Sequence, residues 1–480
     1  MALDFFIIIS RYIFLFLAVF FAANSAAYAL AERGALPAFF KRRAVLNQRL
    51  IIAYTHISGF LILCAKSGWD ARLCAVAGGG LAFVVAGGAF FGAAGSSRLL
   101  ANNVFFLLDI GLIMLARLNP ALCLKQMVFA AAGLGLAFFA PLLIAAARRI
   151  RVLFAAAGAG LLVLPFIAGV TIFGATNWVQ IPVSLKFAKL SFSVSFQPSE
   201  FAKICYILYL SSLFSSSDFI ERDEWSLRER GLINRNKHLI IPAAITASFI
   251  IILVLQRDLG GALMFFTTFI IMLYAAAGRT RIIGAALIMF AAAGRAAYSL
   301  FGHVAARFDS WRDPWADMAD GGYQVTQALF AVSTWGAFGS GLTRGNPAFI
   351  PVRESDFIFA AICEEFGFFF GVCVIFLYIT ILYAALSAVR GRKTPEIALS
   401  LGAAGIIAFQ AFLIIGGNIG LVPLTGVTLP FVSAGGSSVA ASFVMAGLIM
   451  RNTKNIKLRA LEAEKAEAEE NGEEDGYEPE

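Results

Sequence analysis

Thirteen runs of mostly apolar residues, each close to the length that a bilayer requires, follow one another along the 480-residue chain. A helix needs about 20 such residues to cross the hydrocarbon core of a membrane. Hydrophobic residues make up 60% of the sequence and charged residues 14%, which excludes an ordinary soluble enzyme and a disordered chain. We therefore predict an all-α, polytopic membrane helix bundle of about thirteen transmembrane helices. The predicted spans are 5–30, 47–66, 72–96, 103–118, 125–147, 150–174, 199–215, 238–256, 259–277, 281–300, 356–389, 395–417 and 427–450.

Clusters of Lys and Arg fall on every second connection between these spans. Basic residues concentrate on cytoplasmic connections, so the alternation predicts an external N-terminus and a cytoplasmic C-terminus. The net charge of +8 conceals part of this pattern, because residues 461–480 hold ten acids and one base, and the rest of the chain carries 37 bases against 20 acids, or +17. Because the bases lie between apolar runs, we expect bilayer lipids and no nucleic acid as their partners. The clusters are 41–43, 98, 148–151, 228–237, 279–281, 390–393 and 451–459.

The six cysteines and three histidines give little indication of chemistry. The cysteines show no CxxC spacing and lie within or beside apolar runs, so we expect neither a zinc cluster nor a structural disulfide. The histidines are scattered along the chain, which does not support a histidine metal site.

Two connections predicted to be external are too long to be simple turns. Residues 177–197 alternate Val, Leu and Phe with polar residues, a pattern that fits a short hairpin or a segment on the membrane surface. Residues 301–355 form the most polar external stretch and contain tryptophans among glycines and charges. Loops longer than about 12–15 residues are usually functional or disordered. The aromatic residues of 301–355 favour order and function.

Within 301–355, the stretch 307–324 places aspartates beside arginines and aromatic rings. A neighbouring cation keeps a carboxylate ionised, which suits a general base acting on a hydroxyl, and aromatic faces pack against sugar rings. A solvated acidic loop with its tryptophans on the bilayer surface explains the same composition. Both interpretations stay open from the residues alone.

Further polar groups interrupt the apolar runs near their predicted external ends. Gln197-Pro198-Ser199-Glu200 resembles a helix start, and Glu200 and Lys203 are spaced to pair. Residues 256–261 form a polar break that a short turn explains equally well. Acids at 354–356 and 364–365 need cations, water or a metal, because buried charges are costly. Small residues and prolines in 418–438 predict broken helices that line a cavity or pack closely.

Taken in order, five stretches resemble the SEDS family of shape, elongation, division and sporulation proteins. They are QPSEFAK at 197–203, QRDLGGA at 256–262, WRDPWADMADGGYQVTQALFA at 311–331, ESDFIFAAICEEFG at 354–367 and GLVPLTGVTLPFVSAGGSS at 420–438.

The resemblance divides the chain into three parts. Residues 103–451 match a ten-helix core with the large external loop 301–355, residues 1–102 form an N-terminal extension with three spans, and residues 452–480 form a cytoplasmic acidic tail. Departures at Arg257, Val352 and Ala434 leave the subfamily, RodA-like or FtsW-like, unsettled.

The resemblance implies a peptidoglycan glycosyltransferase that polymerises lipid II during elongation, division or sporulation. It places the catalytic aspartate, the general base, at Asp317, with Asp313 and Asp320 as nearby alternatives. It places the polar pair of the central cavity at Glu200 and Lys203. Arginines near the loop are candidates to offset the charge of the diphosphate leaving group. The full set assigned to the substrate cavity is Glu200, Lys203, Arg307, Arg312, Gln324, Arg344, Arg353, Asp356, Ser437 and Ser438.

The same resemblance implies the surroundings of the reaction. The partner is a class B penicillin-binding protein, a transpeptidase, in the bacterial cytoplasmic membrane. A divalent cation, Mg²⁺ or Mn²⁺, held by the diphosphate and a carboxylate fits the chemistry, and no organic cofactor is expected. A lipid II flippase, which a mid-membrane charge such as Asp109 also fits, and a non-catalytic scaffold for the transpeptidase are the alternative functions.

Overall fold

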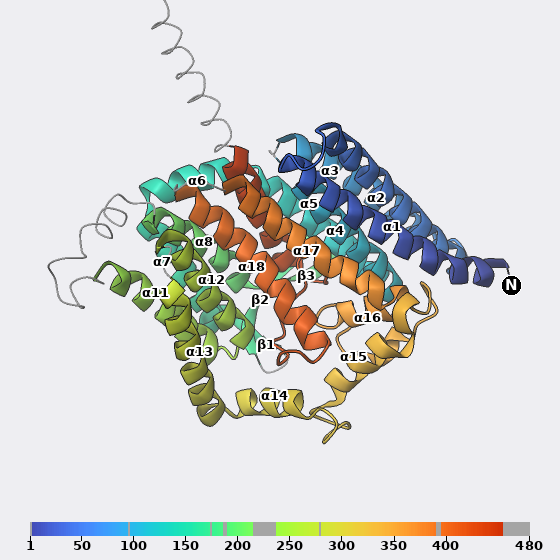
Figure 1. The fold of residues 1–480 in the computed structure, drawn as a ribbon. Coiled ribbons are helices and arrows are strands. Elements are labelled where there is room, and N and C mark those ends of the chain that lie inside the picture. The colour runs from blue at the N-terminus through green and yellow to red at the C-terminus, as the bar shows by residue number, and fades with distance from the viewer. Residues whose placement is uncertain are drawn as a thin grey trace, which may run out of the picture.

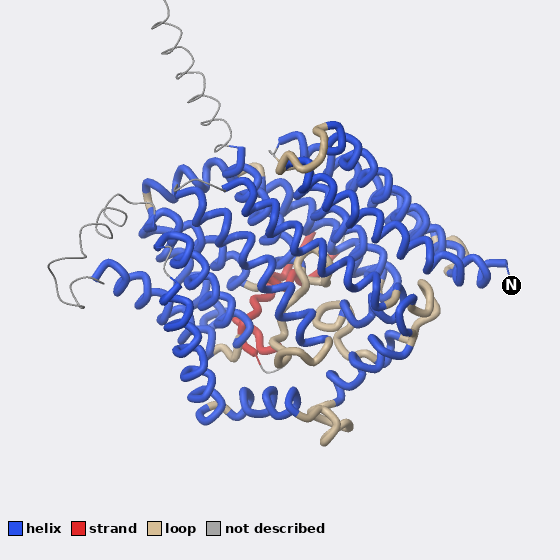
Figure 2. Tube along the Cα trace, in the orientation of Figure 1, coloured by secondary structure: helices blue, strands red, loops and turns tan. Residues whose placement is uncertain are grey.

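The computed structural model of the chain describes residues 2–94, 97–172, 175–185, 190–214, 237–277, 280–389 and 395–454. The predicted acidic tail beyond residue 454 and the basic clusters at 228–236 and 390–393 lie outside the described residues. Helices run side by side in one bundle, with α1 to α3 at one edge, α11 to α13 at the opposite edge, and the strands near the middle (Figures 1 and 2).

The described helices confirm the predicted polytopic, all-α architecture. Each of the thirteen predicted spans contains a helix, and ten of the described helices are long and apolar enough to cross a membrane. The other three are the 17-residue α8, α11 with its apolar part at Ile240–Leu255, and the helix at 436–454. The first seven helices are α1 (Ala2–Glu32), α2 (Phe39–Lys66), α3 (Ala71–Ala94), α4 (Arg98–Leu118), α5 (Pro120–Ala137), α6 (Ala140–Arg149) and α7 (Arg151–Ala168).

The middle of the chain contains a small sheet followed by four long helices. Strands β1 (Gly169–Ile172), β2 (Ala175–Leu185) and β3 (Leu190–Phe196) pair antiparallel in the order β1-β2-β3. Val179 of β2 lies opposite Phe196 of β3, so the alternating segment 177–197 is a hairpin, one of the two predicted alternatives. The helices that follow are α8 (Pro198–Phe214), α11 (Lys237–Leu255), α12 (Leu259–Ala277) and α13 (Thr280–Leu300).

The polar segment 301–355 is ordered as short helices and turns. Helix α14 (Gly302–Arg312) has no buried residue and runs along one end of the bundle, and α15 (Tyr323–Thr334) returns toward it (Figure 1). The remaining elements are η2 (Gly336–Phe338), η3 (Pro347–Phe349), α16 (Ile358–Phe366), α17 (Phe368–Val389), α18 (Pro395–Asn418) and the helix at 436–454.

Two of the predicted spans are broken in the structure. The span predicted at 125–147 starts at Pro120 and is interrupted between α5 and α6. The span predicted at 356–389 consists of α16 and α17, separated at Gly367, whose φ of 94° favours glycine. A Cβ on Gly367 would lie 2.4 Å from the carbonyl oxygen of Ala337 and 2.6 Å from the backbone nitrogen of Gly339. The break therefore lets the end of segment 301–355 lie directly against the helix.

Helix α4 is the central helix, and it connects the first three helices to the rest of the bundle. All of its residues from Leu99 to Ala116 are buried. Asn103 of α4 accepts a hydrogen bond from Ser25 Oγ on α1 (3.1 Å) and donates one to Thr380 Oγ1 on α17 (2.6 Å). Asp109 of α4 contacts His56 of α2 at 2.5 Å, and both side chains are buried. Because α4 starts at Arg98, it runs across the predicted boundary between residues 102 and 103, and that domain division stays a prediction.

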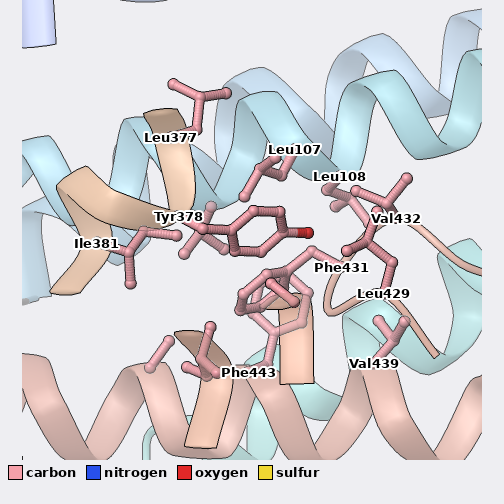
Figure 3. Packing of buried hydrophobic residues seen from close by; sticks show 14 of the residues in the cluster. Leu107, Leu108, Leu377, Tyr378, Ile381, Leu429, Phe431, Val432, Val439 and Phe443 are labelled. Atoms are coloured by element: carbon pink, nitrogen blue, oxygen red, sulfur yellow. The ribbon is translucent and has the colours of Figure 1, made fainter. Parts of the chain in front are cut away.

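Leucine, isoleucine, alanine and phenylalanine make up most of the bundle core. Tyr378 of α17 lies among Leu107 and Leu108 of α4 and Phe431 of the segment before the last helix (Figure 3). Its hydroxyl donates to the carbonyl of Pro430 at 2.6 Å, so that non-helical segment has a buried hydrogen-bond partner. Association of helices in a membrane depends on close packing, because lipid is as apolar as the side chains.

Gly111 provides a test of this close packing. A Cβ on Gly111 would lie 2.6 Å from the carbonyl oxygen of Val432, whereas a Cβ on Gly135 would meet no atom within 4 Å. We expect Gly111→Ala to lower the free energy of unfolding by about 1–3 kcal/mol, because α4 must move away from 432. Gly135→Ala should leave it unchanged or raise it by up to about 1 kcal/mol through helix propensity. Thermal unfolding in detergent measures both, and equal effects would contradict the packing argument.

Candidate functional site

Two adjoining cavities lie where the hairpin, the segment 302–356 and the segment 417–434 meet. We name the first, of about 320 Å³, the hairpin cavity; it is lined by β2 and β3, α8, α12 and residues 425–434. We name the second, of about 380 Å³, the loop cavity; it is lined by α14, α15 and residues 417–426. The lining residues common to both are Arg307, Val352, Asp356 and Gly426.

A buried ion pair lies in the wall of the hairpin cavity. Lys203 Nζ lies 2.9 Å from Glu200 Oε2, one turn of α8 apart, and both side chains are buried. Lys203 also donates to Gln410 Oε1 on α18 at 3.1 Å. The predicted pair is confirmed as a contact, and the hydrogen bond to Gln410 shows how the bundle keeps it in place.

Gln410 continues this chain of contacts into the C-terminal segment. Its amide nitrogen donates to the carbonyl of Thr428 at 2.8 Å, and Thr428 Oγ1 donates to Ser438 Oγ at 2.7 Å. Ser437 Oγ accepts from the backbone nitrogen of Gln197 at 3.3 Å. Ser437 and Ser438, assigned to the cavity from the sequence, therefore support its wall, while Thr428 lines it.

Asp258 is a cavity residue that the sequence did not distinguish from a simple turn. Its Oδ1 accepts from the backbone nitrogen of Gly261 at 2.7 Å, which caps α12. Its Oδ2 accepts from Asn177 Nδ2 at 3.1 Å and Gln197 Nε2 at 3.4 Å, both at the base of the hairpin. Only the fold of β2 onto α12 reveals this role, because 81 residues separate Asn177 from Asp258.

Arg307 and Asp356 occupy the junction of the two cavities. Arg307 Nη1 donates to the carbonyl oxygens of Thr425 at 3.1 Å and Leu424 at 3.4 Å. Asp356 Oδ1 accepts from Ser355 Oγ at 2.9 Å. Burial raises the pKa of Asp356 from 3.8 to about 6, although the Ser355 hydrogen bond and the charge of Arg307 lower it. The junction therefore holds a cation and a carboxyl group that titrates near neutral pH.

The three candidate aspartates of the large loop lie in different surroundings. Asp317 Oδ2 accepts from the backbone nitrogen of Gly321 at 3.0 Å, and Asp313 Oδ1 accepts from the backbone nitrogens of Trp315 and Ala316. Both are exposed, and neither is among the lining residues of the two cavities. Asp320 lines the loop cavity. The structure thus brings only Asp320 of the three to a cavity wall.

Among the other predicted site residues, some line a cavity and some do not. Gln324 lines the loop cavity, as does Trp311, whose indole nitrogen donates to the carbonyl of Gly420 at 2.9 Å. Of the four candidate arginines, only Arg307 lines the cavities. Arg353 lies 3.7 Å from Glu354, and its guanidinium donates to the carbonyl of Ala348. The structure does not place Arg312, Arg344 or Arg353 in either wall.

Two acids of α16 hold the segment before it. Glu365 Oε1 lies 3.2 Å from Arg117 Nε of α4, and its Oε2 accepts from the backbone nitrogen of Thr343. Glu364 Oε1 accepts from the backbone nitrogen of Asn346 at 2.7 Å. The acids at 364–365 therefore have the partners that their burial requires. They hold the backbone of segment 301–355 in position and do not line the cavities.

Among the described residues, no three His, Cys, Asp or Glu side chains gather as a metal-binding group. A cation at this site would take most of its ligands from elsewhere. Asp320 and Asp356 both line the loop cavity, and Mg²⁺ commonly binds through one or two carboxylates together with substrate phosphates and water. The residues present therefore fit a cation that arrives with a diphosphate, and the predicted divalent cation stays a prediction.

The fold and the cavities define a class of protein, a polytopic membrane protein whose polar site lies at one end of an apolar bundle. Residues 100–458 match the model of the FtsW, RodA and SpoVE family of cell cycle proteins, and the chain belongs to that family. This confirms the SEDS membership predicted from the five motifs.

Known relatives and a solved structure agree with this membership. The chain is 33% identical over 291 residues to the peptidoglycan glycosyltransferase RodA of Mycobacterium bovis, covering 58% of this chain and 57% of the relative. It is 30% identical over 341 residues to a probable peptidoglycan glycosyltransferase FtsW of Alcanivorax borkumensis, covering 68% and 82%. It is also similar to a chain of a solved peptidoglycan synthase complex that coordinates polymerization and crosslinking, with a TM-score of 0.60, 25% identity and coverage of 74% and 97%.

The buried Glu200–Lys203 pair predicts a stability effect. Glu200→Gln or Lys203→Met alone leaves one charge buried without its partner, and we expect each to lower the free energy of unfolding by about 3–5 kcal/mol. The double variant should lose clearly less free energy of unfolding than the two single variants lose together, because neither charge remains. Thermal unfolding of the four proteins in detergent measures the coupling. The exposed Lys66–Asp4 contact at 3.9 Å is the control, and Lys66→Met should change stability by no more than about 1 kcal/mol.

The raised pKa of Asp356 predicts a pH-dependent difference in stability. The folded protein holds this proton more tightly than the unfolded chain, so its stabilising contribution is present below about pH 4 and lost as pH rises through about 6. Asn cannot ionise. As pH rises between these values, the free energy of unfolding of Asp356→Asn should therefore increase relative to that of wild type by up to about 3 kcal/mol. Unfolding of both proteins across this range tests it, with the exposed Asp309→Asn as control. A difference that does not change with pH would contradict the burial of this carboxyl group.

Proposed function

We propose that the chain is a peptidoglycan glycosyltransferase that polymerises lipid II into glycan strands, through a site on the outer face of the bacterial cytoplasmic membrane. The observation that carries the proposal is the junction of two cavities at Arg307 and Asp356. A polymerase must bring two lipid-linked sugars together, one as acceptor and one as donor. Two adjoining cavities with a shared, charged wall suit that task. The similarity to proteins named as peptidoglycan glycosyltransferases supports the same reaction.

The proposed reaction is the attack of an acceptor hydroxyl on the anomeric carbon of the donor. The new bond joins the hydroxyl oxygen to that carbon, and the bond to the undecaprenyl diphosphate breaks. A carboxylate accepts the hydroxyl proton, and a cation offsets the charge on the leaving diphosphate. Arg307 is the cation that we assign to the diphosphate, because it alone of the four candidate arginines lines the cavities.

We assign the general base to Asp317, on the match of its flanking residues to the family. In the structure it is exposed and holds the turn at Gly321, which lines the loop cavity. Asp317 is therefore one short turn from the cavity, and the proposal requires that the turn closes over bound substrate. Asp320 already lines the cavity and is the first alternative. Asp313 is the second.

The orientation in the membrane, the protein partner and the cation belong to the same proposal. The N-terminus is external and the C-terminus cytoplasmic, as the alternating basic clusters indicate. A class B penicillin-binding protein is the proposed partner, and a diphosphate-bound Mg²⁺ or Mn²⁺ the proposed cation. The similar synthase complex, in which polymerization and crosslinking are coordinated, supports such a pairing.

The structure favours a polymerase over a lipid II flippase. A flippase needs a polar path across the membrane, and Asp109 is the mid-membrane charge in question. Asp109 is completely buried against His56, and it is not among the residues that line either cavity. A non-catalytic scaffold needs neither cavity.

Glycan-strand synthesis from purified lipid II, with the transpeptidase partner present, tests the proposal. We expect Asp317→Ala to reduce polymerisation by about 10²–10⁴-fold, the usual contribution of a general base. Asp320→Ala and Asp313→Ala should retain most of the activity. The control is Asp309→Asn, an exposed acid of α14 that contacts Tyr298 away from the cavities, and it should polymerise normally.

Three outcomes would change the proposal. Normal polymerisation by Asp317→Ala with loss in Asp320→Ala would move the base to the cavity wall. An inactive wild type that moves lipid II across vesicle membranes would favour the flippase. An inactive wild type that stimulates the transpeptidase would favour the scaffold.

A further inference from the structure

Helices α2 and α3, which a short turn joins, bring a pair of cysteines together. Cys64 lies in the last turn of α2 and Cys74 in the first turn of α3, and their sulfur atoms are 3.5 Å apart. Both are free thiols in the structure. Their ten-residue separation gave no indication of pairing in the sequence, because it has no CxxC form and only the turn between the helices brings them into contact.

The turn between the two cysteines is held rigidly. The carbonyl of Cys64 accepts from the backbone nitrogen of Trp69 at 2.7 Å, and the carbonyl of Asp70 accepts from the backbone nitrogen of Cys74 at 2.9 Å. Asp70 Oδ1 also accepts from the backbone nitrogen of Arg72 at 2.7 Å, which caps α3. Gly68 and Trp69 both adopt positive φ, 69° and 64°, which closes the turn tightly. The two thiols are thus presented to each other by backbone geometry.

The cysteine pair lies at the same end of the bundle as the candidate site. Lys66, two residues after Cys64, is 3.9 Å from Asp4 at the start of α1. Two turns further along α1, Arg11 donates to the carbonyl of Gly339 at 3.0 Å, in the segment that leads from the loop cavity to α16. The turn 67–70 therefore faces the same side of the membrane as segment 301–355. If the cavities face outward, as the proposed function requires, the pair faces the compartment where disulfides form and persist.

We propose that Cys64 and Cys74 form a disulfide bond in the mature protein, and the inference rests on the outward orientation in the proposed function. The reaction is thiol–disulfide exchange with an oxidised disulfide, of a small molecule or a protein, as the co-reactant. The thiolate of Cys74, the less buried of the two, attacks one sulfur of that disulfide and releases the first thiol. Cys64 then attacks the Cys74 sulfur and releases the second thiol. The two cysteines lose two electrons and two protons in total, and the oxidant gains them as two thiols.

The bond would fasten the outer end of α3 to α2. Helix α3 is the less buried of the two, because 33% of its most apolar 18-residue stretch lies inside the bundle, against 56% for α2. A covalent link at the turn therefore stabilises α3, which has less packing inside the bundle than α2. Polymerisation chemistry does not depend on this link, so the two proposals fail separately.

Peptide mapping of the full-length protein tests the bond. The protein is taken from aerobically grown cells in their membranes, free thiols are blocked with a maleimide, and the chain is digested with trypsin without reductant. Cleavage after Lys66 and Arg72 separates the cysteines, so a peptide containing Cys64 joined to one containing Cys74 requires the disulfide. We expect the joined pair in wild type and in Cys373→Ser, and its loss on reduction and in Cys74→Ser. Reduction should lower the melting temperature of wild type and of Cys373→Ser, but not that of Cys74→Ser.

Several results would overturn the inference. Both cysteines carrying maleimide, even after the membranes are treated with oxidised glutathione, would show that the thiols do not join. Linkage of either cysteine to a different cysteine would also contradict it. Labelling of reduced Cys74 by a membrane-impermeant maleimide only in inside-out vesicles would place the turn in the cytoplasm. Glycan synthesis measured on the same preparations distinguishes these failures from a failure of the proposed function.

Discussion

The site depends on keeping ionised and polar groups inside an apolar bundle. An unpaired charge in hydrocarbon is costly, and Glu200 and Lys203 contact each other, while Lys203 also donates to Gln410. Gln410 in turn satisfies the backbone of Thr428, where the chain is not helical. One set of contacts therefore stabilises the ion pair and also the broken segment that forms the cavity wall. Irregular backbone at membrane depth requires such partners.

The antiparallel hairpin has a similar function in an otherwise helical protein. Its strands satisfy each other's backbone groups, which allows non-helical chain to lie among helices. At its base, Asn177 and Gln197 reach Asp258, whose other oxygen caps α12. The hairpin thus fixes one wall of a cavity against the start of a helix. Glu364 and Glu365 fix segment 301–355 through the backbone nitrogens of Asn346 and Thr343, and Glu365 also pairs with Arg117 of α4.

These supports explain how an apolar bundle contains a well-defined polar site. The walls of the two cavities come from segments far apart in the chain, and they meet at Arg307 and Asp356. Asp356 combines partial burial with a nearby cation, and burial raises its pKa from 3.8 to about 6. The aspartate-rich turn lies at the edge of the loop cavity. Closure of that turn over substrate would complete the site without changing the bundle.

The sequence by itself determined the membrane class, the helical runs and the polar pair Glu200–Lys203, because these depend on local length, hydrophobicity and spacing. The resemblance of five motifs indicated the family. The sequence allowed both a hairpin and a surface segment at 177–197, and it grouped four arginines that tertiary structure separates. Only the tertiary structure decided that Arg307 and Asp356 form a junction, that Asp258 joins the site, and that Asp317 lies just outside it. The cysteines show the same limit, because Cys64 and Cys74 meet only through a left-handed turn. Contacts between segments tens to hundreds of residues apart depend on how buried polar groups find partners in three dimensions, and a linear pattern does not contain that information.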